Sequence, residues 1–387
     1  MNNIKLPVAI ELIVDDVGWH NGADQRNINL PARSGLPRFH HTDDIKALNA
    51  IGKGLDMKIT CSLVLGDWDK KNRLRGVPHI THDVEGWDAA AAIDPDYTKA
   101  YFNALEESEY LDYCLHGLMH SYYSNGKLVT ARQYYPDNVD EHGNKTGGFS
   151  WLPAEEFENM VKLFFDIFND WGFKKDVLTF ASPSGCFGTP TDKGNIEYAR
   201  VLRKYGLLYW GNGWVNHDKY VDTIEGMIIS KGACIVPWNA YDVDPSYLEI
   251  TTDPEKIGTH IGAHLANFIR YNHEKNFEYV DAWIDYFKRQ AEVFGTMLAR
   301  DTAFSCSQTL YSRFAKTEKT DGRYIIDLSD VDRQYAIGKK NEFYVSLKNG
   351  TEPSSCEGGR ISLYETKASF KTYKIERDGT SIVKISV

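Results

Sequence analysis

The 387-residue sequence has no long hydrophobic run, no cluster of basic residues and no paired cysteines, and each absence removes a class of protein. No stretch reaches the roughly 18 uninterrupted apolar residues of a membrane span, so we expect no such span. Acidic residues outnumber basic ones by 54 to 44, which gives a net charge of −10. With no basic run anywhere, nucleic acid and anionic membranes are not expected as partners.

Two further absences narrow the chemistry. The six cysteines lie singly along the chain, so we expect buried thiols and neither a zinc–thiolate site nor a disulfide framework. No Gly-rich phosphate loop and no Gly-x-Ser-x-Gly turn occurs, which argues against nucleotide hydrolases, kinases and serine esterases. The N-terminal residues carry no signal-peptide pattern, but a processed secreted chain would begin in the same way. The sequence therefore leaves the compartment open, and it leaves the oligomeric state open too.

Apolar runs alternate with amphipathic segments through residues 1–315. This alternation predicts an α/β domain with a parallel sheet, and the absence of a Gly-x-Gly-x-x-Gly turn favours a closed barrel over a dinucleotide-binding sheet. The predicted strands cover residues 10–14, 57–65, 110–116, 177–181, 207–210, 228–230, 233–238 and 247–251. The predicted helices cover residues 42–52, 99–107, 155–171, 193–204, 254–271 and 279–299.

The pattern changes near residue 316. Residues 316–387 contain short alternating strands separated by turns such as Lys348-Asn349-Gly350, which predicts a small antiparallel β module. A module of this kind either binds sugar or packs and spaces the larger domain, and we favour packing.

Two predicted strands are followed by residues of types that commonly bind metals. Asp15 and Asp16 follow the first strand, whereas His116 and His120 follow the third in an H-x-x-x-H pair. In a barrel these strand ends share one rim, and on a helical turn the two imidazoles would lie on one face. Two histidines and one carboxylate suit zinc or another divalent metal.

With these motifs the sequence resembles the NodB-homology polysaccharide deacetylases, carbohydrate esterase family 4, over residues 5–300. The matching segments are Val14-Asp15-Asp16, the His116 to His120 pair, and Phe180-Ala181-Ser182-Pro183-Ser184-Gly185.

The resemblance implies a distorted (β/α)7 barrel and a metal-dependent carbohydrate deacetylase. It makes Asp16, His116 and His120 the ligands of a divalent metal, with zinc the expected ion, and Asp15 the general base. It also implies a late histidine as general acid, for which His260 and His264 are the candidates. We prefer His264, because Asn267 follows one turn later.

The main departure from the family is in the third motif, where Ala181 stands in place of an arginine that orients the base. Arg26, Arg33 or Arg38 could supply that cation. A non-catalytic carbohydrate-binding protein on the same fold, or a metal-dependent hydrolase of another amide or ester bond, therefore stays as an alternative.

Aromatic side chains near strand ends are the candidates for stacking on sugar rings, because their apolar faces suit pyranose surfaces. These candidates are Trp19, Trp68, Trp210, Trp214 and Trp238.

Overall fold

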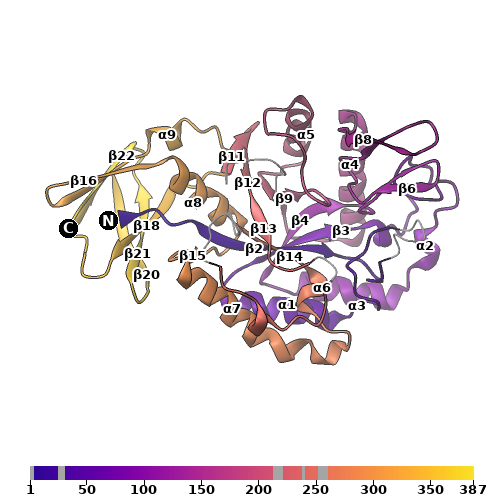
Figure 1. Ribbon diagram of the computed structural model, residues 1–387, viewed down its shortest axis with the longest axis horizontal. Helices are drawn as coiled ribbons and strands as arrows, with labels where there is room; N and C mark the ends of the chain where they lie inside the picture. The colour runs from indigo at the N-terminus through magenta and orange to yellow at the C-terminus, as the bar shows by residue number, and fades with distance from the viewer. Residues whose placement is uncertain (1–3, 25–30, 212–220, 238–239, 252–259) are drawn as a thin grey trace.

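The computed structural model describes residues 4–24, 31–211, 221–237, 240–251 and 260–387. Most of the chain forms a mixed α/β unit built on a largely parallel sheet, and its C-terminal part forms antiparallel sheets (Figure 1). No helix in these ranges is long and apolar enough to cross a membrane.

The main sheet is centred on strand β2 (Ala9–Val17), in which all nine residues are buried. Parallel neighbours flank β2 on both sides, and β11 is the one strand of the main path that pairs antiparallel. The path runs from β11 (Val221–Ile224) through β12 (Met227–Ser230), β10 (Tyr209–Gly211), β9 (Val177–Ala181), β4 (Leu111–Gly117) and β3 (Ile59–Val64) to β2, and then to β14 (His260–His264) and β13 (Gly232–Cys234). A short strand, β15 (Met297–Leu298), pairs with the beginning of β2.

The predicted closed barrel is not found in the described part of the chain. The sheet is open, with β11 and β13 at its two ends and no pairing between them among the described residues. Five helices correspond to predicted ones: α1 (Thr42–Leu55), α3 (Pro95–Glu106), α4 (Ala154–Trp171), α5 (Lys193–Lys204) and α7 (Val280–Val293). Helix α8 (Thr302–Phe314) was not predicted.

Two predicted elements are wrong. Residues 247–251 form no strand, because Asp244 accepts a hydrogen bond from the Ser246 amide and Pro245 begins a short 3-10 turn, η3 (Pro245–Tyr247). The helix predicted for residues 254–271 is instead strand β14 followed by the single turn α6 (Leu265–Phe268), with residues 252–259 outside the described ranges. Gly262 lies in the middle of this segment, and pairing with the buried β2 outweighs a weak helical preference.

Residues 316–387 form two antiparallel sheets around a second apolar core. Their strands are β16 (Lys316–Thr320), β17 (Arg323–Asp327), β18 (Glu342–Lys348), β19 (Ser355–Glu357), β20 (Gly359–Thr366), β21 (Phe370–Arg377) and β22 (Ile382–Ser386). The N-terminal strand β1 (Ile4–Lys5) pairs with β18, so both ends of the chain contribute to these sheets.

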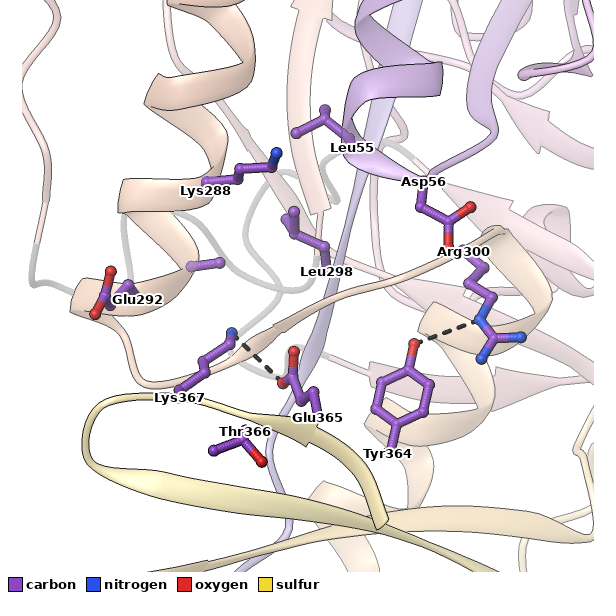
Figure 2. A pocket seen from close by; sticks show the side chains of 11 residues that line it. Leu55, Asp56, Lys288, Glu292, Leu298, Arg300, Tyr364, Glu365, Thr366 and Lys367 are labelled. Atoms are coloured by element: carbon purple, nitrogen blue, oxygen red, sulfur yellow. Dashed lines mark hydrogen bonds and ion pairs between the residues drawn. The ribbon is translucent and has the colours of Figure 1, made fainter. Parts of the chain in front are cut away.

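A crevice of about 640 Å³ lies between α7, the end of α1 and the hairpin of β20 and β21 (Figure 2). Arg300 donates to the Tyr364 hydroxyl across it at 3.4 Å, and Lys367 lies 3.5 Å from Glu365. Leu298, which lines the crevice, pairs with Ile10 at the beginning of β2. The crevice therefore lies at the opposite end of β2 from Asp15 and Asp16.

Candidate metal centre

The site is built where strand β2 ends. A register shift against β3 falls between Val14 and Val17, and Asp16 has a left-handed φ of 64°. A regular strand would direct Asp15 and Asp16 to opposite faces of the sheet, but an irregularity with one left-handed residue breaks that alternation and re-aims a side chain. Both aspartates are buried, with 7% and 4% of their surface exposed. Two buried carboxylates side by side are costly unless a cation or a proton compensates for their charge.

His116 and His120 bring their imidazoles to Asp16. The Nε2 atoms of His116 and His120 lie 3.8 and 3.6 Å from Asp16 Oδ1, and all three donor atoms are within 4.8 Å of one another. His116 is in β4 and His120 is in the bend that follows, with a φ of 49°, so the helical turn predicted for this pair is wrong. The left-handed conformation of His120 turns its imidazole back toward that of His116, so the two rings meet without a helical turn.

The protonation of His116 suits a metal ligand. Its Nδ1 lies 2.7 Å from the carbonyl oxygen of Ala181, which can only accept, so Nδ1 carries the hydrogen and Nε2 presents a lone pair. That Nε2 is buried and has no hydrogen-bond partner among the described residues. A metal-binding histidine usually donates the hydrogen of its other ring nitrogen to a carbonyl or carboxylate, and this bond fixes the tautomer.

The spacing of the two rings also fits one ion. Two imidazoles that bind a tetrahedral ion through bonds of about 2.0–2.1 Å have ring centres about 5 Å apart. The centres of His116 and His120 are 5.1 Å apart, with an angle of 57° between the ring planes. Asp16, His116 and His120 therefore form a group that could hold a metal ion.

A second group with metal-binding donors consists of His41, Asp43 and His273 at the beginning of α1. Both Nδ1 atoms lie 3.2 Å from Asp43 Oδ2. However, the His41 and His273 rings stack with centres 3.7 Å apart and planes at 22°, and the Asp43 amide already donates to His41 Nδ1. Lone pairs in nearly parallel planes do not converge, so this group suits a metal less well than Asp16, His116 and His120 do.

The two late histidines lie on β14, directly beside β2. His264 is in register with Asp15 at the end of the strands, whereas His260 is in register with Glu11 four residues deeper. Burial lowers the pKa of His264, and the neighbouring Asp15 carboxylate opposes that shift. Burial lowers the pKa of His260 to about 4. Register therefore brings His264, and not His260, to the level of the aspartates.

Asn267 fixes the end of β14. Its Oδ1 accepts a hydrogen bond from the His264 amide at 2.8 Å, and its Nδ2 donates to the carbonyls of Pro237 and Ala240 at 3.0 and 2.8 Å. Asn267 is fully buried. The backbone of His264 and the segment after β13 are thus held by one side chain, as its position one turn after His264 suggested.

The tryptophans are placed differently from what stacking on a sugar would need. Trp19, Trp68 and Trp210 are fully buried, so their rings have no open surface. The Trp68 indole donates to the Gly18 carbonyl at 2.6 Å, and the Arg33 guanidinium lies 4.1 Å from the centre of a Trp19 ring. Trp214 and Trp238 lie outside the described residues.

The arginines considered as replacements for the missing motif residue have other partners. Arg33 pairs with Asp67, and Arg38 donates to Asp44 at 2.8 and 2.6 Å. Arg26 lies outside the described residues. In the third motif, Ala181 contributes its backbone carbonyl to His116, a role that any residue type could fill.

The parallel sheet and the strand-end site together define a mixed α/β protein with a candidate His₂Asp metal centre. No protein-family model and no curated protein matches the sequence. Among solved structures, the carbohydrate deacetylase Agd3 matches with 8% identity and a TM-score of 0.49, over 98% of this chain and 65% of its own.

A 4-alpha-glucanotransferase from Thermococcus litoralis matches with 12% identity and a TM-score of 0.35, over 76% of this chain and 41% of its own. A candidate glycoside hydrolase/deacetylase from Parabacteroides distasonis matches with 11% identity and a TM-score of 0.41, over 95% of this chain and 84% of its own. The chain thus spans less than two thirds of the first two structures.

Proposed function

We propose that the protein is a metal-dependent hydrolase that removes acetyl groups from a polysaccharide or oligosaccharide. The observation that carries the proposal is the convergence of Asp16, His116 and His120, with Asp15 and His264 in register on adjacent strands at the same sheet edge. The resemblance of the sequence to NodB-homology deacetylases supplies the substrate class.

Asp16, His116 and His120 would hold the metal. Two imidazoles and one carboxylate suit zinc and leave room for other ligands. When bound, such an ion supplies Lewis-acid chemistry, which acidifies water and polarises a carbonyl group.

The proton transfers fall to two neighbouring side chains. The Asp15 carboxylate accepts a proton from the water that attacks the acetyl carbonyl carbon, and His264, in the imidazolium form that the neighbouring Asp15 carboxylate favours, donates a proton to the nitrogen or oxygen that leaves. The bond between the acetyl group and the sugar breaks, and acetate and a sugar amine or alcohol are the products. Asp15 is buried, which keeps its carboxylate away from bulk water and strengthens its interaction with the reacting atoms, whereas His264 is only half-buried.

One observation favours a second candidate within the same class. The motif position of the orienting arginine is Ala181, and Arg33 and Arg38 pair with other carboxylates. A metal-dependent hydrolase that acts on a different amide or ester bond would keep the ligand set and alter this part of the site. In a non-catalytic carbohydrate-binding protein, Asp15 and His264 would have a structural role and no role in proton transfer.

Metal content and acetate release test the proposal together. The purified protein should bind one equivalent of zinc and release acetate from acetylated oligosaccharides. His116→Ala should lose both, Asp15→Asn should keep the metal but lose at least 10²-fold in rate because the proton acceptor is gone, and His41→Ala, in the stacked group, should keep both. Bound zinc without acetate release would favour the other hydrolase, whereas His116→Ala with full metal content would exclude this centre.

A further inference from the structure

The loop between the two candidate histidine ligands has no regular structure, yet hydrogen bonds hold its backbone on two sides. Between His116 and His120 the chain leaves β4, and the carbonyls of Gly117 and Leu118 accept hydrogen bonds from the amides of Leu65 and Gly66 at 3.2 and 2.7 Å. Those bonds fix one side of the loop against the end of β3. The amides on the other side face away from β3 and need a different partner.

That partner is one side-chain oxygen. The backbone amides of Leu118, Met119 and His120 all donate to Gln133 Oε1, at 3.0, 3.1 and 3.1 Å. Gln133 is fully buried, and its Nε2 donates weakly to Met160 Sδ at 3.6 Å. Three consecutive amides that converge on one acceptor form a concave backbone site of the kind that usually cradles an anion.

The surroundings leave room for this amide oxygen and for little else. A β-carbon at Gly117 would lie 2.8 Å from Gln133 Oε1, so glycine lets the side chain approach the loop. A buried backbone amide left without an acceptor is destabilising, because it loses its hydrogen bond to water and gains none in the protein. With three amides sharing one acceptor, its loss would favour a different loop conformation over the one observed.

We propose that Gln133 is a positioning residue for the candidate metal centre. Gln133 holds His120 in its left-handed conformation and so directs the Nε2 atom of His120 toward Asp16. The metal-binding part of this inference rests on the proposed function. His116 is fixed separately, by β4 and by the Ala181 carbonyl. Gln133 therefore acts on one ligand of the three, which predicts weakened binding and altered geometry.

Four variants separate this role from general packing. Gln133→Leu removes the acceptor, and Gln133→Asn keeps an amide that is one methylene too short to reach the loop. Gln133→Glu keeps an oxygen at the same place, and accepting three amide hydrogens favours its charged form. Met160→Leu is the matched control, because it removes the contact of Nε2 and leaves Oε1 in place.

The first readout is binding of Co²⁺, followed by its visible absorption, and of Zn²⁺, followed by competition with a chelator. Outer-shell partners of metal ligands are typically worth 10–100-fold in affinity. We expect Gln133→Leu and Gln133→Asn to lose that much affinity and to change the Co²⁺ spectrum, whereas Gln133→Glu and Met160→Leu should stay within about threefold of the parent protein. Parent-like affinity and spectrum in a folded Gln133→Leu variant would overturn the inference.

The second readout needs no metal and no activity. In the metal-free protein, amide hydrogen exchange of the peptide covering residues 117–121 should speed up in Gln133→Leu and Gln133→Asn and stay slow in Gln133→Glu. If the parent protein bound no metal, the proposed function would fail, but hydrogen exchange would still test whether Gln133 holds the His120 loop. Unchanged exchange in Gln133→Asn would overturn the positioning role even if Gln133→Leu failed to fold.

Discussion

Beneath the aspartates and His264 lies a second layer of buried polar residues. Glu11 and His260 are in register on β2 and β14, on the faces that carry Asp15 and His264 four residues later. Burial raises the pKa of Glu11 to about 8 although the Thr302 hydroxyl donates to it at 2.6 Å, and burial lowers the pKa of His260 to about 4. Both side chains are therefore largely neutral near pH 7, so this deeper layer adds little charge beneath the candidate metal centre.

Replacing Glu11 should change how stability depends on pH. The folded-state pKa of about 8 lies above the ordinary value of 4.5, so the folded protein holds this proton more tightly than the unfolded chain does. The contribution is fully present below about pH 4.5 and is lost as the pH rises through 8. Glu11→Gln stays neutral, so its Tm relative to the parent should rise steadily from pH 5 to pH 9. Exposed Glu318→Gln is the control, and parallel Tm curves for Glu11→Gln and the parent would contradict this assignment.

The sequence pointed to the three residues of the candidate metal group better than to their surroundings. Asp16, His116 and His120 lie at or just after the ends of buried strands, and this position and the family resemblance suggested them, while their role as metal ligands remains a prediction. Glu11 and Gln133 carry no comparable signal, because one lies inside an apolar run and the other in an irregular loop. Only the interval of four residues between Glu11 and Asp15 points to a shared strand face, and only tertiary structure brings Gln133 to the His120 loop.

Among the elements, most of the amphipathic helices were predicted from the sequence, whereas strand β14 was predicted as a helix and helix α8 was not predicted. Helix α5 has the predicted bounds and α4 begins one residue earlier, since their apolar faces repeat with helical spacing. Strand β14 is only five residues long and carries histidines at both ends, so its sequence has no strand pattern. Its identity comes from the space beside β2, which a sequence pattern does not contain.

The beginning of α1 is fixed by a buried hydrogen-bond network centred on Asp44. Asp44 is fully buried and accepts hydrogen bonds from Arg38, from the His41 amide and from Asn276 at 2.6 Å. Burial opposes ionisation, but the bonds from His40 and Arg38 outweigh it and hold the pKa of Asp44 well below its usual range. One carboxylate thus joins the helix to the loop before it and to residues 270–276.

Removing the Asp44 side chain should lower the free energy of unfolding strongly, although the side chain is small. Asp44→Ala leaves the Arg38 guanidinium without its carboxylate, and breaking a buried ion pair in this way costs about 3–5 kcal/mol. Urea unfolding should show that loss. The adjacent Asp43→Ala removes only partly exposed pairs and should cost at most about 1 kcal/mol. Similar losses for the two variants would show that the buried network contributes little.

At the scale of the whole molecule, the division at residue 315 predicted from composition remains a prediction, and the contacts across it are extensive. Strand β1 pairs with β18, and Ile4 and Tyr311 belong to the apolar core of the C-terminal sheets. The sequence pattern changes near residue 316 because the parallel sheet with helices gives way to short antiparallel strands, and this change can be seen in the sequence. The sequence does not report that β1 adds a strand to one of the two C-terminal sheets, since that pairing joins residues more than 300 positions apart.

Gln308 on α8 is the test of how strongly the two parts depend on each other. It is fully buried, its Nε2 donates to the carbonyls of Pro7 and Tyr344 at 2.8 and 3.0 Å, and its Oε1 accepts from the Tyr344 amide at 2.8 Å. Gln308→Leu keeps the volume but leaves these groups without partners, at about 1–3 kcal/mol for each buried group. In calorimetry the parent should unfold in one transition, and the variant in one transition at lower temperature, because the shared core couples both parts. Zinc affinity should not change, since Pro7 lies before β2 and the metal centre lies at its far end. Two transitions, with only one of them shifted, would show that the C-terminal sheets fold independently.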